Sequence, residues 1–185
     1  MEFKTVHRPF VCETEEKKSR FIAHVVPFVE FDVVLNELKK THRKANHHVT
    51  AFRKWSDSGQ IVENAKDDGE PAGTSGMPVL KVLSGHDLMD VAVIVTRYFG
   101  GVKLGTGGLA RAYSGAAKAV LNKAELVTWV KVIQRTLQIT FEQAPKFEAV
   151  VAKEGIVIVS REYTADGLCV VLEGPEAILR QIELG

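Results

Sequence analysis

The stretch TRYFGGVKLGTGGLARAYSGA, residues 96–116, decides how the rest of the chain is interpreted. It begins inside the apolar run 90–99, which predicts a buried strand. Small and apolar residues then recur at helical spacing over 106–124, with Thr106 as a candidate N-cap. Glycine pairs on either side of Lys103 connect the two elements. We call residues 99–108 the glycine loop, which either turns the chain or binds a ligand.

The glycine loop has the chemistry of an anion site. The first N–H groups of a helix have no partner within the helix, and they carry a partial positive charge. Glycine lets the backbone approach an anion closely, and Lys103 adds a full charge. These features favour an anion or phosphate at Gly105–Gly108. The alternative is that the glycines only make a tight turn and close helix–strand packing, and the residues alone leave both open.

Two well-known nucleotide-binding loops do not fit this stretch. A P-loop needs Lys directly after its second glycine, and Thr106 stands there instead. The segment GTGGLA at 105–110 matches a loose dinucleotide pattern, but no strand directly precedes it. P-loop and Rossmann functions are therefore disfavoured.

Two further polar segments are candidates for chemistry. In DDGEPAGTSGMP at 67–78, the carboxylates of Asp67, Asp68 and Glu70 could hold Mg²⁺ or act as acid and base. The same composition is typical of a turn. The adjacent His47 and His48 lie on a predicted strand, point to opposite faces and cannot share one metal ion. No Cys/His spacing typical of zinc occurs, so no metal site is predicted.

The chain as a whole predicts an α+β fold in two domains, 1–131 and 132–185. In the first, the pattern predicts strands at 19–29, 47–55 and 90–99, helices at 30–45, 74–85 and 106–124, and a loop at 56–76. In the second, it predicts a strand within 126–141, a helix from Ala144, strands at 155–163 and 167–174, and a helix at 175–184. This order is the ferredoxin-like pattern without its final strand.

Composition excludes several classes of protein. The formal net charge is +1, which by itself demands no polyanion partner. Two cysteines far apart in sequence indicate neither a disulfide framework nor a metal site. The first residues lack the pattern of a signal peptide, and no apolar run is long enough to span a membrane. A cytoplasmic protein without membrane association is expected.

Four segments together resemble the IMPACT family, in its bacterial YigZ-like branch. They are KKSRFIAHV (17–25), ANHHVTAF (45–52), DDGEPAGTSGMPVL (67–80) and VIVTRYFGGVKLGTGGLARAYSGAAKAVL (93–121). The resemblance implies a first domain similar to domain two of the fifth small-subunit ribosomal protein and to domain IV of elongation factor G. It implies a ferredoxin-like second domain, lacking a final strand, similar to domain V of that factor. Both relatives touch ribosomal RNA, and the eukaryotic members of the family regulate translation.

The resemblance also implies that the shared segments form one binding surface. The implied binding residues are His47, Asp67, Asp68, Glu70, Thr74, Arg97, Tyr98, Phe99, Gly100, Gly101, Lys103, Gly105, Gly107, Gly108 and Arg111. The sequence departs from the family at two positions. Val49 stands where the family commonly has Cys, and Met77 replaces a frequent Lys. These departures disfavour a thiol chemistry common to the family and remove one positive charge.

Three functions are compatible with these residues. The first is a non-enzymatic, translation-linked protein that recognises RNA or a ribosome-associated partner, with Arg97, Lys103 and Arg111 on phosphates. The second is an enzyme that uses Mg²⁺ and acts on a phosphorylated small molecule, since superfolds host many functions. The third is a pure protein–protein regulator. We favour the first function, and we expect no cofactor.

Overall fold

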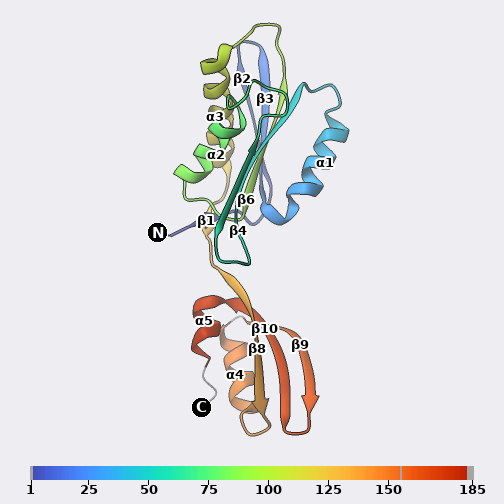
Figure 1. The fold of residues 1–185 in the computed structure, drawn as a ribbon, viewed down its shortest axis with the longest axis vertical. Helices are drawn as coiled ribbons and strands as arrows, with labels where there is room; N and C mark the ends of the chain where they lie inside the picture. The colour runs from blue at the N-terminus through green and yellow to red at the C-terminus, as the bar shows by residue number, and fades with distance from the viewer. Residues whose placement is uncertain (1, 155, 183–185) are drawn as a thin grey trace. The chain divides into compact units, whose positions relative to one another are not determined.

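A computed structural model of the chain describes residues 2–154 and 156–182 (Figure 1). The chain forms two compact units, residues 1–129 and 130–185. Each unit combines an antiparallel sheet with helices. The prediction of a mixed α and β chain is therefore confirmed.

The first unit is built on a five-stranded antiparallel sheet. In sheet order its strands are β2 (Phe10–Glu16), β3 (Ser19–Pro27), β6 (Val91–Tyr98), β4 (His47–Trp55) and β5 (Ile61–Lys66). The central strand β6 is buried from its first residue to Arg97, as its continuous apolar run predicts. A short pair, β1 (Lys4–Thr5) with β7 (Val127–Thr128), lies outside this sheet.

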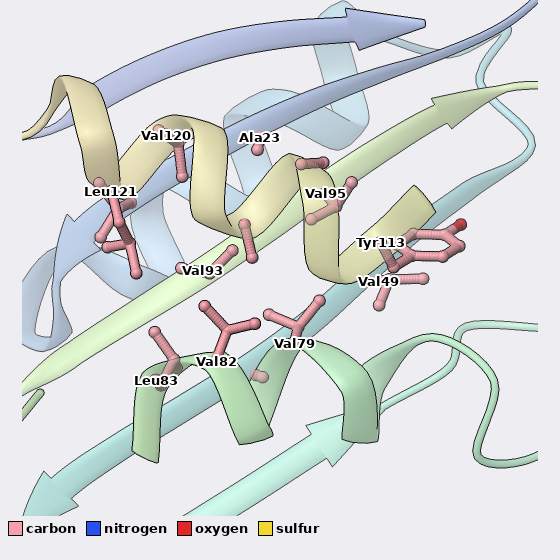
Figure 2. Packing of buried hydrophobic residues seen from close by; sticks show 14 of the residues in the cluster. Ala23, Val49, Val79, Val82, Leu83, Val93, Val95, Tyr113, Val120 and Leu121 are labelled. Atoms are coloured by element: carbon pink, nitrogen blue, oxygen red, sulfur yellow. The ribbon is translucent and has the colours of Figure 1, made fainter. Parts of the chain in front are cut away.

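Helices cover both faces of this sheet. The helices α2 (Gly76–Gly85) and α3 (Gly105–Lys123) lie on one face, and α1 (Phe31–Thr41), preceded by the 3₁₀ turn η1 (Phe28–Glu30), lies on the other (Figure 1). Alternate residues of β6 serve the two cores: Val93 and Val95 pack toward α2 and α3, whereas Ala92 and Ile94 belong to the cluster with α1. Figure 2 shows the first of these cores, where α2 and α3 pack on the strands.

The glycine loop is shaped by close backbone approaches. A Cβ atom added at Gly100 would come within 2.1 Å of the Lys18 backbone, so only glycine fits against the β2–β3 turn. Gly101 and Gly105 have φ angles of +86° and +72°, in the left-handed region that glycine tolerates best. A Cβ atom at Gly107 would meet only the Arg111 guanidinium, 3.5 Å away. The geometry of the turn therefore explains why Gly100, Gly101 and Gly105 are glycines. It imposes no such requirement on Gly107.

Three sequence predictions in this unit were wrong. The predicted loop 56–76 contains strand β5, and the polar strand β2 was not predicted. Both are edge strands of the sheet, and their exposed polar residues hide the alternation that identifies a strand. Thr106 is not an N-cap, because α3 begins one residue earlier, after Leu104.

The second unit has three antiparallel strands in the order β8-β10-β9, with two helices. Its elements along the chain are β8 (Val132–Thr140), α4 (Ala144–Glu154), β9 (Val157–Thr164), β10 (Gly167–Pro175) and α5 (Glu176–Gln181). Phe147, Leu172 and Leu179 are among its fully buried core side chains. Residues 183 and 184 of the predicted closing helix lie outside the described residues. Among the described helices, none is long and apolar enough to cross a membrane.

Candidate functional site

A buried carboxylate lies under the glycine loop. Glu70 follows β5, and its Oε1 accepts hydrogen bonds from Arg97 Nη1 of β6 (2.5 Å) and from Tyr113 Oη of α3 (2.7 Å). The Glu70 and Arg97 side chains are only 4% and 6% exposed. Burial raises the pKa of Tyr113 far above its usual value, and the hydrogen bond to Glu70 adds to this shift. The phenol is therefore a fixed, neutral donor.

The same ion pair is connected to the start of the glycine loop. Ser19 Oγ on β3 accepts from Arg97 Nη2 (3.4 Å) and from the Gly100 N–H (3.1 Å). On the other side, Asn46 Oδ1 accepts from the Phe99 N–H (2.8 Å). The loop is thus held at both sides, which explains why its backbone comes so close to β3 at Gly100.

Asp67 caps helix α2. Its carboxylate accepts from the Gly73 N–H (2.7 Å), the Ser75 N–H (3.1 Å) and hydroxyl (2.6 Å), and the Gly76 N–H (2.8 Å). Burial acts to raise the pKa of Asp67, but these hydrogen bonds outweigh it and the pKa lies below its usual value. Thr74, one of the suggested binding residues, donates its hydroxyl to the Pro71 carbonyl (2.6 Å). Sequence reasoning missed this cap because Asp67 lies eight residues before the N-cap position, Ser75.

Asp68 ties the same loop to strand β4. Its Oδ2 accepts from the His48 N–H (2.6 Å), and its carbonyl accepts from His47 Nδ1–H (2.8 Å). The ring of His47 therefore presents Nε2 to Glu70 Oε1, 3.7 Å away. The three carboxylates thus have separate partners: Asp67 binds the start of α2, Asp68 binds the backbone of β4, and Glu70 binds Arg97 and Tyr113. No group of three or more His, Cys, Asp or Glu side chains among the described residues could hold a metal ion.

A groove of about 520 Å³ opens above the buried pair. Phe99, 46% exposed, and the exposed Lys103 form part of its wall. The Arg97 guanidinium lies 5.5 Å from the Phe99 ring centroid. The groove is lined by Asn46, His47, Glu70, Pro71, Arg97, Phe99, Lys103, Leu104, Gly105, Thr106 and Leu109. Six of these, His47, Glu70, Arg97, Phe99, Lys103 and Gly105, are among the binding residues that the sequence suggested.

Helix α3 begins at this groove without a side-chain cap. Its first-turn N–H groups therefore keep their hydrogen-bonding capacity for solvent or a ligand. Glu70 and Arg97 neutralise each other, so Lys103 is the uncompensated charge in the lining. The groove combines an ammonium group, free backbone donors and an exposed aromatic ring.

The other suggested residues do not line the groove. Tyr98 lies on the opposite face of the sheet, where its hydroxyl meets His42 Nδ1 at 2.8 Å. Arg111 is exposed and lies farther along α3. The remaining residues outside the lining are Asp67, Asp68, Thr74, Gly100, Gly101, Gly107 and Gly108. Sequence reasoning missed Asn46, Leu104, Thr106 and Leu109 as lining residues, and only their adjacency to the motif residues could have suggested them.

Comparison with known proteins places this site within a known family of domains. Residues 17–121, more than half of the chain, match the family described as the Impact N-terminal domain. The chain is 42% identical over 114 residues to the IMPACT family member YvyE of Bacillus subtilis (strain 168), covering 60% of this chain and 52% of that protein. It is 32% identical over 160 residues to the IMPACT family member YigZ of Escherichia coli (strain K12), covering 85% of this chain and 78% of that one.

Two solved structures extend the comparison. A crystal structure described as that of a hypothetical protein is 29% identical, with a TM-score of 0.73, and covers 97% of this chain and 88% of that one. A structure described as the two-domain translational regulator Yih1 is 30% identical over 67% of this chain and 48% of that one, with a TM-score of 0.36. All four segments on which the sequence resemblance rests lie within the matched range 17–121.

Proposed function

The chain belongs to the IMPACT family, and from this membership and the groove's geometry we propose a translation-linked protein that binds RNA through its glycine loop. The resemblance to the family implies a role in the regulation of translation, which supplies the biological setting of the proposal. The proposal includes the finer fold assignment, a first unit similar to ribosomal protein and elongation factor domains. The second unit supports a ferredoxin-like assignment, because the order β8-β10-β9 with two helices matches that fold's first three strands.

One observation supports the proposal above the others: an uncompensated ammonium group lies beside an uncapped helix start and an exposed aromatic ring. Lys103 can contact a phosphate, and the first N–H groups of α3 can donate to its oxygens. Phe99 can stack on a base that leaves its own strand. Arg97 holds Glu70 and the ring of Phe99 in place rather than contacting phosphate directly.

The alternative of an enzyme that uses Mg²⁺ receives less support from the geometry. Such an enzyme needs carboxylates that converge on one point of the substrate site. Here Asp67 caps α2, Asp68 binds the β4 backbone and Glu70 binds Arg97 and Tyr113. The third function suggested by the sequence is a pure protein–protein regulator. A pull-down distinguishes it from RNA binding, because a protein partner would stay bound after nuclease treatment.

A salt-dependent titration tests this proposal. We expect the full chain to bind single-stranded RNA and ribosomes, and to lose affinity steeply as salt rises. Loss of one phosphate contact in Lys103→Ala should lower affinity roughly fourfold at about 0.15 M salt and reduce the salt slope by about 0.7. The control is Lys39→Ala, an exposed lysine on α1, on the other face of the sheet. Affinity that does not change with salt, or equal effects of the two variants, would refute the proposal.

A further inference from the structure

A second groove runs between α2 and α3 on the outer side of the first unit. Its volume is about 510 Å³, and it is lined by Pro78, Lys81, Val82, Gly85, His86, Ala110, Arg111, Ser114 and Lys118. Lys81 comes from α2, while Arg111 and Lys118 come from α3. The lining thus includes three permanently cationic side chains and no carboxylate. We call it the α2–α3 groove.

The charge of these two helices differs from that of the rest of the chain. The chain has 24 Lys and Arg against 23 Asp and Glu, yet α2 and α3 contain no Asp or Glu. Helix α1, on the other face, contains Asp32 and Glu37 as well as its two lysines. Surface helices ordinarily intersperse both signs, which lowers repulsion between like charges. A helix layer with cations alone is therefore complementary to a polyanion.

The cations of the groove are also free to act on a ligand. Lys81, Arg111 and Lys118 are exposed, and none forms an ion pair with any residue that the structure describes. Because an α-helix rises about 1.5 Å per residue, Arg111 and Lys118 lie two turns, roughly 10 Å, apart on one side of α3. Between them, Ser114 donates its hydroxyl to the Ala110 carbonyl (2.7 Å). Small residues thus separate the charges and leave room for a chain to lie along the helices.

Arg111 connects this groove to the glycine loop. Its guanidinium lies 3.5 Å from the position that a Cβ atom would take at Gly107, in the first turn of α3. Lys103 lies just before that turn. Lys103 precedes α3, and Arg111 and Lys118 follow along that helix. Lys81 lines the same groove as Arg111 and Lys118 from α2, which lies beside α3 (Figure 1).

We propose that the phosphate backbone of an RNA strand continues from the glycine loop past Arg111 into the α2–α3 groove. The inference rests on the proposed function, from which it takes RNA as the ligand. It adds the surface that contacts most of the phosphates of that RNA. The α2–α3 groove has no Phe, Tyr or Trp in its lining, so it contacts phosphates and carries no base recognition. The same lack disfavours a folded protein partner, because protein interfaces are centred on buried aromatic anchors.

The test is a salt series with a labelled single-stranded oligo(U) as the probe and the full chain as the protein. Because each neutralised phosphate contributes about 0.7 to the salt slope, Lys81→Ala/Lys118→Ala should lower the slope by about 1.4. The same loss should weaken binding roughly tenfold at about 0.15 M salt. The matched control is Lys39→Ala/Lys40→Ala, which removes two exposed positive charges from α1 and should leave the slope unchanged. Unfolding curves show whether each variant is folded.

The outcomes separate the inference from the proposed function. If Lys103→Ala weakens binding while Lys81→Ala/Lys118→Ala matches its control, the inference is wrong and the proposed function stands. If only Lys81→Ala/Lys118→Ala weakens binding, RNA binds the α2–α3 groove without the glycine loop, which overturns both the continuous path and the site of the proposed function. If the unmodified chain does not bind the probe, or binds polyglutamate as tightly as oligo(U), both fail.

Discussion

The two faces of strand β4 use polar groups in opposite ways, although His47 and His48 are neighbours in sequence. On the α2–α3 face, His47 lies near the Glu70–Arg97 ion pair, and the exposed Lys103 of the same groove forms no ion pair with the residues that the structure describes. On the α1 face, His48 Nδ1 meets Thr96 Oγ1 at 3.1 Å, and Tyr98 meets His42. Burial lowers the pKa of both His24 and His48, so these rings stay neutral within the sheet.

The difference separates a structural face from a binding face. On the α1 face, the neutral pairs His42–Tyr98 and His48–Thr96 are hydrogen-bonded. The aromatic cluster of Phe28, Phe31 and Phe52 belongs to the same face. On the α2–α3 face the buried charges of Glu70 and Arg97 cancel, and the exposed charges that line the two grooves are positive. The grooves of the α2–α3 face thus gather cations without acidic neighbours, whereas α1 carries both signs, and charge removal on the two sides should have different effects.

The largest expected effect comes from breaking the buried ion pair. In Glu70→Gln, the Arg97 guanidinium keeps its burial and loses its counter-charge. Removing one partner of a buried pair typically costs about 3–5 kcal/mol. We expect a loss of this size in the free energy of unfolding of the first unit, measured by urea denaturation. Both tryptophans, Trp55 and Trp129, lie in that unit, so their fluorescence reports on it alone.

A paired substitution sharpens this prediction. Replacing both charges with apolar side chains of similar size, as in Glu70→Leu/Arg97→Met, should recover much of the loss, because no buried charge is then left alone. Equal stability of Glu70→Gln and the unmodified chain would contradict the assignment of this pair as the structural support of the groove.

A smaller effect is expected from the neutral histidines of the α1 face. Because burial lowers the pKa of His24, this side chain binds a proton at a higher pH in the unfolded chain than in the folded chain. Stability should therefore be greatest above the ordinary histidine pKa and fall as pH decreases from about 7 to 5.5. In His24→Leu this fall should be shallower, measured by urea denaturation at several pH values. If the stability of His24→Leu falls as steeply with decreasing pH as that of the unmodified chain, groups other than His24 cause the fall.

The elements that sequence reasoning predicted well are those with a strong periodic signal. The buried run of β6 and the small-residue face of α3 specify their elements, because burial on one or both sides dictates their composition. The edge strands β2 and β5 gave no such signal. The absence of Asp and Glu from α2 and α3 was visible in the sequence, but its meaning depends on the two helices lying side by side.

The sequence predicted which residues belong to the region of the candidate site. It did not show which of them support the site internally and which face a ligand. Glu70, Arg97 and Tyr113 come from three elements, and only the folded chain shows that one carboxylate binds both partners. Arg97, expected on a phosphate, is used internally. Tyr98, adjacent to it, points to the other face because successive strand residues alternate. Nearness in sequence thus identified the region. The alternation of side chains between the two faces of a strand determined which residues lie on the same face.

The most direct test of a one-sided binding face is lysine footprinting with and without a single-stranded RNA. An acetylating reagent labels exposed lysines, and mass spectrometry measures the labelling at each position. The account predicts that RNA protects Lys81, Lys103 and Lys118, on or beside α2 and α3, while Lys39 and Lys40 on α1 react equally in both states. Equal protection on both faces, or protection of α1 alone, would contradict it.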